Sequence, residues 1–204
     1  MKKLLATVAC TLVFFAAGAQ DNDNHPFFIP VDFGASFASM DGINGAFYMR
    51  AAVEYRFNHL KGPFILAELD TRTHPYKDAL MTTANVTAGD AAFTDILIGP
   101  GWRFMLSDSF KIAVSLQGGV SNMAFKEVKP NVNTLTDASY TLIGHDYWAA
   151  AAKASVMFEY YLNPVFDLFI GAGLPATFVP YFASSADPLV FFPTVSAGFN
   201  MALF

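Results

Sequence analysis

Apolar and polar side chains alternate along most of the chain with a period of two. In the stretch 46–57, one set of alternate positions is apolar: Phe47, Met49, Ala51, Val53, Tyr55 and Phe57. The positions between them hold every charge of the stretch: Ala46, Tyr48, Arg50, Ala52, Glu54 and Arg56. Successive side chains of a β-strand point to opposite faces, so this stretch is predicted to be a strand with one apolar and one ionic face.

The same alternation predicts eight strands. They span residues 28–38, 46–57, 63–73, 92–106, 110–122, 147–162, 165–178 and 189–204. Tight turns rich in turn-forming residues follow the second, fourth and sixth strands, at 58–62, 107–109 and 163–164. The other connections are longer, at 74–91, 123–146 and 179–188, with an intermediate turn at 39–45. All tight turns therefore lie at one end of an antiparallel sheet, and an even number of strands allows it to close into a barrel.

Prolines interrupt the fourth and the seventh predicted strands. Pro100 lies between Gly99 and Gly101 in the fourth strand, and Pro175 lies in the seventh. Every strand of a closed barrel is internal, so each proline is expected to mark a bulge or a strand end.

The charges within the predicted strands all share one face. Seven are acidic and six are basic, so they nearly cancel: Asp32, Glu54, Glu68, Asp70, Asp95, Glu159 and Asp167 against Arg50, Arg56, Arg72, Arg103, Lys111 and Lys153. If this face lines the barrel, isolated charges in its narrow interior are costly and pairing is expected. A paired network fills the lumen and predicts a plug, with a narrow path for water or small solutes as the alternative.

Size decides which face is predicted to point outward. A soluble ligand-carrying barrel has the same alternation with its apolar face inward. An eight-stranded barrel holds few side chains or one small ligand, whereas the apolar face carries about thirty bulky residues. Aromatic residues gather near the strand ends, at two levels that are typical of membrane interfaces. The pattern predicts an all-β, eight-stranded, antiparallel up-and-down transmembrane β-barrel with a polar, ion-paired interior.

The N-terminus resembles an export signal. Residues 1–19 combine Lys2 and Lys3, an apolar run and the small residues Ala17, Gly18 and Ala19, which predicts a cleaved signal peptide. A periplasmic tether at 20–27 and the barrel at 28–204 follow. Cys10 lies within the signal, so the mature chain has no cysteine and no disulfide.

Composition excludes two other classes. With 17 acidic and 12 basic residues, the chain without its two signal lysines has a net charge of −7, which disfavours nucleic acid as a partner. Mean hydropathy is +0.37, but no window after the signal holds 18 uncharged apolar residues, so a helical membrane protein is not expected.

On these features the chain resembles the small eight-stranded outer-membrane barrels of the OmpA and OmpX type and the outer-membrane β-barrel proteins of Bacteroidetes-like bacteria. The resemblance implies residence in the outer membrane of a Gram-negative bacterium, contact with its lipids and lipopolysaccharide, and periplasmic chaperones and the barrel-assembly machinery as transient partners. It also implies that the terminal Phe204 is part of the assembly signal. The alternation places Phe204 on the face of Gly198, Asn200 and Ala202, opposite the apolar face of the last strand. Either a bulge shifts the last residues or the signal is weaker here.

Enzymatic chemistry has little support in the sequence. Some barrels of this size modify lipopolysaccharide acyl chains with a His, a Ser and an acidic residue. The candidates are His145 with Asp146 and Ser139, and His74 after Asp70 and Arg72, but neither has the His-x-Ser pattern of the lipid A deacylases. Both histidines are interpreted as solvated loop residues at the barrel rim, and a lipopolysaccharide-modifying enzyme remains the alternative function.

No cofactor or metal is predicted, because neither a phosphate-binding glycine loop nor clustered ligands occur in the sequence. Lys126, Glu127 and Lys129 are candidates to meet lipopolysaccharide phosphates, with a solvated loop as the plainer interpretation. The predicted role is structural or interactive, for a monomeric barrel that presents loops 74–91 and 123–146 to an unknown extracellular partner.

Overall fold

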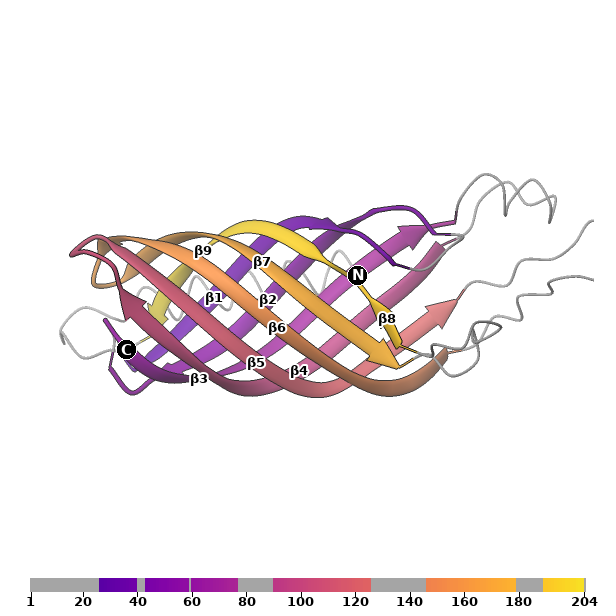
Figure 1. Cartoon of the computed structure of the whole chain (residues 1–204), viewed down its shortest axis with the longest axis horizontal. Helices are drawn as coiled ribbons and strands as arrows, with labels where there is room; N and C mark the ends of the chain where they lie inside the picture. Colours follow the sequence, from indigo (N-terminus) through magenta and orange to yellow (C-terminus); the bar gives the residue numbers. More distant parts are fainter. Residues whose placement is uncertain are drawn as a thin grey trace, which may run out of the picture.

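The structure is an all-β barrel. The computed structural model describes residues 26–39, 43–58, 60–76, 90–125, 146–178 and 189–203. The strands run obliquely around the long axis (Figure 1). Their bounds are β1 Phe27–Ser36, β2 Ala46–Arg56, β3 Gly62–Pro75, β4 Asp90–Met105, β5 Phe110–Phe125, β6 Asp146–Asn163, β7 Phe166–Phe178, β8 Leu189–Phe191 and β9 Thr194–Leu203. Within these ranges no helix is long and apolar enough to cross a lipid bilayer.

The sheet closes on itself. Each strand from β1 to β7 pairs antiparallel with the next, β7 pairs with β8 and β9, and β9 pairs with β1. Along β7 the register continues from Gly173 opposite Thr194 to Ala176 opposite Phe191 without a shift. β8 and β9 are therefore two parts of one barrel strand, interrupted at Phe192 and Pro193. The barrel has eight strands, as the alternation predicts, and its closure leaves no open edge.

Several strands extend further than predicted at the end that carries the longer connections. β3 continues through His74 and Pro75, which pair with Ala91 and Asp90 of β4. β5 continues to Phe125. The segment 74–91 is therefore part strand and not all loop, because backbone pairing persists beyond the last clearly alternating residues.

The expectation that prolines mark bulges or strand ends is wrong at both positions. β4 runs through Pro100, and the same register relates Ile98 to Gly118 and Gly101 to Ser115 on either side of it. β7 runs through Pro175, whose carbonyl accepts a hydrogen bond from the Phe192 backbone N–H at 2.8 Å. Proline lacks only its own N–H. The barrel tolerates that local loss without inserting a residue.

The register of the last strand is continuous. β9 pairs with β1 in one register from Phe27 opposite Leu203 to Ser36 opposite Thr194. The bulge considered for this strand is therefore absent through Leu203, and Ala202 is buried. Phe204 itself lies outside the described residues, as do the signal peptide and most of the tether.

The two faces of the barrel wall are inverted relative to a soluble protein. All thirteen charges of the predicted strands are buried, none more than 4% exposed, whereas Asp90 and Asp146, the first residues of β4 and β6, are half-buried and exposed, respectively. Outward positions are apolar and open, with Phe47 at 65%, Leu116 at 64% and Ile170 at 63% exposure. Outward aromatic rings lie towards both ends of the strands, including Phe57 and Trp102 near the tight turns and Trp148 near the opposite end. This confirms the predicted orientation of the two faces.

Candidate functional site in the barrel interior

One group of interior charges lies towards the tight turns. We call it the turn-side network, and it contains Glu54, Arg56, Arg103, Lys111, Glu159 and Asp167. Arg103 binds Glu159 with two nitrogens, at 2.7 and 2.8 Å, and Glu54 at 2.8 Å. Arg56 also pairs with Glu54, and it meets Asp167 at 3.1 Å. Lys111 completes the group with a contact of 3.2 Å to Asp167. Three cations face three anions.

A second group lies on the side of the longer connections. This loop-side network contains Asp32, Arg50, Glu68, Asp70, Arg72, Asp95 and Lys153. Arg50 binds Asp32 at 2.6 Å and Glu68 at 3.2 Å, while Lys153 binds Glu68 at 2.7 Å and Asp70 at 3.0 Å. Arg72 joins Asp70 at 2.8 Å to Asp95 at 2.7 Å. Four anions here face three cations.

Neutral hydroxyl groups extend the loop-side network. Tyr48 accepts a hydrogen bond from Lys153 at 2.9 Å, and Ser196 donates to Asp32 at 2.5 Å. Asp95 is the least supported carboxylate, because its Oδ1 is buried and has no hydrogen-bond partner among the described residues. Buried charges require such partners, since removing an ion from water costs several kcal/mol.

An apolar layer lies between the two networks. We call it the apolar belt, and it consists of Ala52, Phe64, Leu66, Ala113, Met157 and Phe169, all at most 6% exposed. On β2 the inward positions run from Arg50 through Ala52 to Glu54. On β6 the belt residue Met157 stands between Lys153 and Glu159 in the same way. None of the ion pairs found between described residues joins the two networks across this layer.

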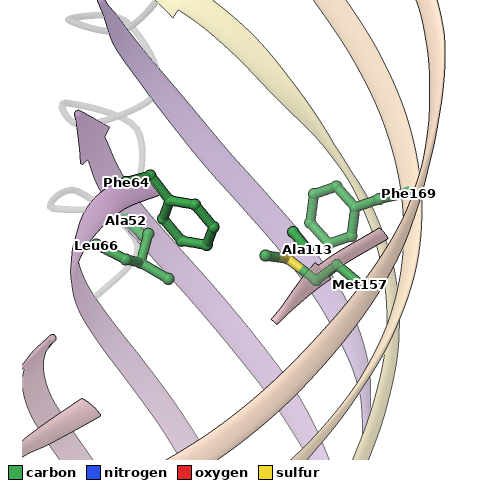
Figure 2. Packing of buried hydrophobic residues seen from close by; sticks show 6 residues of the cluster. All are labelled: Ala52, Phe64, Leu66, Ala113, Met157 and Phe169. Atoms are coloured by element: carbon green, nitrogen blue, oxygen red, sulfur yellow. The ribbon is translucent and has the colours of Figure 1, made fainter. Parts of the chain in front are cut away.

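Phe64 and Phe169 project from opposite walls towards each other (Figure 2). They stand on β3 and β7, which are four strands apart around the eight-stranded ring. Gly101 of β4 makes room for the Phe64 ring, since a Cβ atom at this position would lie 2.1 Å from its Cζ. A side chain on residue 101 would therefore displace the largest group of the belt.

The belt was missed at the level of sequence, although a signal was present. Phe64 and Leu66 share parity with Glu68, Met157 with Glu159, and Phe169 with Asp167. Following the charged face into its uncharged positions identifies these side chains as interior.

Aromatic rings close over Arg72 at the loop side. We call His74, Phe93 and Phe192 the aromatic cap. The Arg72 guanidinium lies 4.5 Å from the Phe192 ring and 5.4 Å from the Phe93 ring, and these two rings are 4.6 Å apart. All three cap residues are fully buried. Phe192 belongs to the interruption between β8 and β9, where it turns inward.

The interpretation of His74 as a solvated rim residue is wrong. Its Nδ1 lies 2.7 Å from the Asn44 carbonyl, and its Nε2 lies 3.4 Å from the Ser36 hydroxyl. A carbonyl only accepts, so Nδ1 carries the proton and Nε2 faces Ser36 as an acceptor. A base beside a hydroxyl is one element of nucleophilic chemistry. Both side chains are completely buried, however, and no carboxylate orients the imidazole, so the described geometry serves packing.

Most of the other candidate residues fall outside the described part of the chain. These are His145 and Ser139, the loop residues Lys126, Glu127 and Lys129, and Phe204. Asp146, the first residue of β6, is exposed. The described residues contain no group of three His, Cys, Asp or Glu side chains that could hold a metal ion.

A small pocket lies beside the loop-side network. Asp32, Arg50 and Lys153 line one side, and Gly171 and Gly173 leave space on the other. Its free volume is about 10 Å³, room for one water molecule. Met157 of the apolar belt is also part of its lining.

Comparison with known proteins supports the fold. Neither a protein family model nor a curated relative matches the sequence. Among solved structures, Neisserial surface protein A matches with a TM-score of 0.57 and 14% identity, over 87% of this chain and 97% of that one. Ail of Yersinia pestis, in complex with the heparin analogue sucrose octasulfate, matches with a TM-score of 0.48 and 13% identity, over 86% of this chain and 99% of that one. OprG from Pseudomonas aeruginosa matches with a TM-score of 0.47 and 14% identity, over 89% of this chain and 98% of that one.

The fold is thus that of a small eight-stranded outer-membrane barrel, of the OmpA/OmpX-like kind. The sequence identities to these structures are too low to assign their functions to this chain. A functional proposal therefore rests on the interior of the barrel itself.

Proposed function

We propose that this protein is an integral outer-membrane barrel with a closed lumen, whose role in the cell envelope is structural or interactive. The observation that carries the proposal is the inverted wall. An apolar surface faces outward, and all thirteen charges of the predicted strands are buried among their own partners. Such a surface is stable against lipid, whereas water would drive these barrels to associate.

Because the lumen is closed, the proposed activity is placed outside the barrel interior. Two salt-bridged networks, the apolar belt and the aromatic cap fill successive levels of the interior. A permeation path would have to pass every one of these levels. Interaction is therefore assigned to the loops, which join the strands at the end opposite the tight turns.

Neither alternative gains a specific observation from the structure. A narrow channel is disfavoured by the belt, and a lipopolysaccharide-modifying activity at His74 is disfavoured by the burial of His74 and Ser36. His145 lies outside the described residues, so a role for it stays a prediction. Deletion of the gene with mass analysis of lipid A tests it, and an altered acyl pattern would favour the enzyme.

A matched pair of charge substitutions tests the membrane location. Leu116→Arg places a charge in the middle of the outward face, which at the bilayer midplane costs about 2–4 kcal/mol. Asp108→Arg places the same side chain at the tight turn between β4 and β5, beyond the apolar surface. We expect L116R to reduce folding into lipid vesicles and D108R to leave it unchanged, as read from the mobility of unboiled protein in gels.

A soluble barrel predicts the reverse ranking. There Leu116→Arg would improve solubility at no cost in stability, and the wild-type chain would be recovered from the soluble periplasmic fraction. That result would overturn the proposal.

A further inference from the structure

We infer that the apolar belt, and not the salt bridges, is the barrier that closes the lumen to ions. The inference rests on the proposed membrane barrel and identifies which residues keep it closed. It predicts that truncating two belt side chains converts a barrel without ion conductance into one that conducts ions.

The chemistry of the belt distinguishes it from the layers on either side. Ala52, Phe64, Leu66, Ala113 and Phe169 offer no polar side-chain atom to an ion. The sixth member, Met157, offers a thioether, which already accepts a hydrogen bond from Arg50 at 3.3 Å. An ion that crosses this layer loses its water and meets no oxygen or nitrogen ligand from the six belt side chains, which is how hydrophobic constrictions block conduction. The Phe64 and Phe169 rings are already in contact with protein cations, Arg103 at 4.9 Å and Arg50 at 5.6 Å.

The ionic layers differ in this respect. Charges that share partners can change one contact while they keep another, which the belt side chains cannot do. In the loop-side network Glu68 contacts both Arg50 and Lys153, and Asp70 contacts both Arg72 and Lys153. Carboxylates with two cationic partners supply the exchange sites that a cation could use to enter.

The belt spans the full width of the interior. Phe64 on β3 faces Phe169 on β7 across the lumen, as Figure 2 shows. Ala52 on β2 and Met157 on β6 are also four strands apart around the ring. These two opposed pairs place apolar side chains on both sides of the lumen at this level.

The charge balance predicts the selectivity of an opened path. The loop-side network holds four carboxylates against three cations within the described residues, and the turn-side network is balanced. A path through the belt would therefore favour cations over anions, because its loop-side half carries the excess negative charge.

The test is planar-bilayer conductance of folded protein. The opening variant is Phe64→Ala/Phe169→Ala, and its matched control is Phe93→Ala/Phe192→Ala, which removes two phenyl rings from the aromatic cap. We expect cation-selective single-channel current steps from the belt variant, and no conductance from the wild type or the cap variant. A second belt variant, Leu66→Asn/Met157→Gln, keeps the volume but wets the layer, and replaces the first if the loss of two rings prevents folding.

The outcomes separate the two claims. If the folded belt variants show no conductance, the inference is overturned, but the proposal of a closed membrane barrel is not affected. Equal conductance of the belt and cap variants would also overturn it, because closure would then depend on the whole lumen. Conductance of the wild type would overturn the closed lumen itself.

Discussion

The turn-side and loop-side networks have the same cationic composition, two arginines and one lysine, but different balances of charge. The turn-side network matches three cations to three carboxylates. The loop-side network must satisfy four carboxylates with three cations, so Arg50, Arg72 and Lys153 each serve two. The comparison shows that every carboxylate of a buried network can have a cationic partner while the network as a whole stays unbalanced in its charge. Its sensitivity to substitution should then depend on the sign of the charge removed.

The largest difference is expected between the two lysines. Lys153→Met removes a cation that serves Glu68 and Asp70 and leaves the loop-side network two charges negative. We expect a loss of about 3–5 kcal/mol, as for other broken buried pairs. Lys111→Met leaves Asp167 its contact with Arg56, so the loss should be about 1–2 kcal/mol. Urea titrations of the folded fraction in lipid vesicles measure both, and equal losses would remove the distinction between the networks.

Carboxylates should show the opposite ranking. Asp167→Asn leaves Lys111 without a carboxylate within ion-pair distance, although the amide oxygen can still accept a hydrogen bond. We expect a loss of about 2–3 kcal/mol. Asp95→Asn brings the loop-side network to three anions and three cations, so stability should change by less than about 1 kcal/mol. The same titrations apply, and a greater loss for D95N than for D167N would contradict the charge-balance argument.

The smallest effect should come from a neutral partner. Tyr48→Phe removes the hydroxyl that accepts from Lys153 but changes no charge and keeps the ring. Lys153 retains two carboxylates, so a loss of about 1 kcal/mol is expected. A loss as large as that of Lys153→Met would mean that hydrogen bonding, and not charge, governs the loop-side network.

Alternation was sufficient to predict the fold and the face of all thirteen charges in the predicted strands. Arg50 and Glu68 are assigned to the same face by the alternation along their own strands. This assignment does not depend on which strand lies next to them. It was not sufficient to predict which charges meet. Arg103 of β4 reaches Glu54 of β2, and Lys153 of β6 reaches Glu68 of β3, which are contacts across the lumen that depend on strand tilt.

Local features at the strand ends were harder to predict. His74 followed charged residues and preceded a proline, which is also the pattern of a loop, but continued pairing with β4 draws it into the barrel. The inward position of Phe192 agrees with the alternation, because Phe192 shares its face with Asn200 and Ala202, but the interruption of the last strand at Phe192 and Pro193 was not predicted. The belt, in contrast, was readable from parity and was overlooked because only charged positions were followed.

The seam between β1 and β9 has a consequence for the order of folding. It joins Phe27 to Leu203, almost the greatest separation along the chain that the described residues allow, and contacts between distant residues form slowly. Until this seam pairs there is no enclosed interior, and Asp32 of β1 cannot reach Ser196 of β9. The charged face can stay hydrated throughout the curling of the sheet. We therefore expect the release of its water and the completion of the loop-side contacts to coincide with the meeting of the first and last strands.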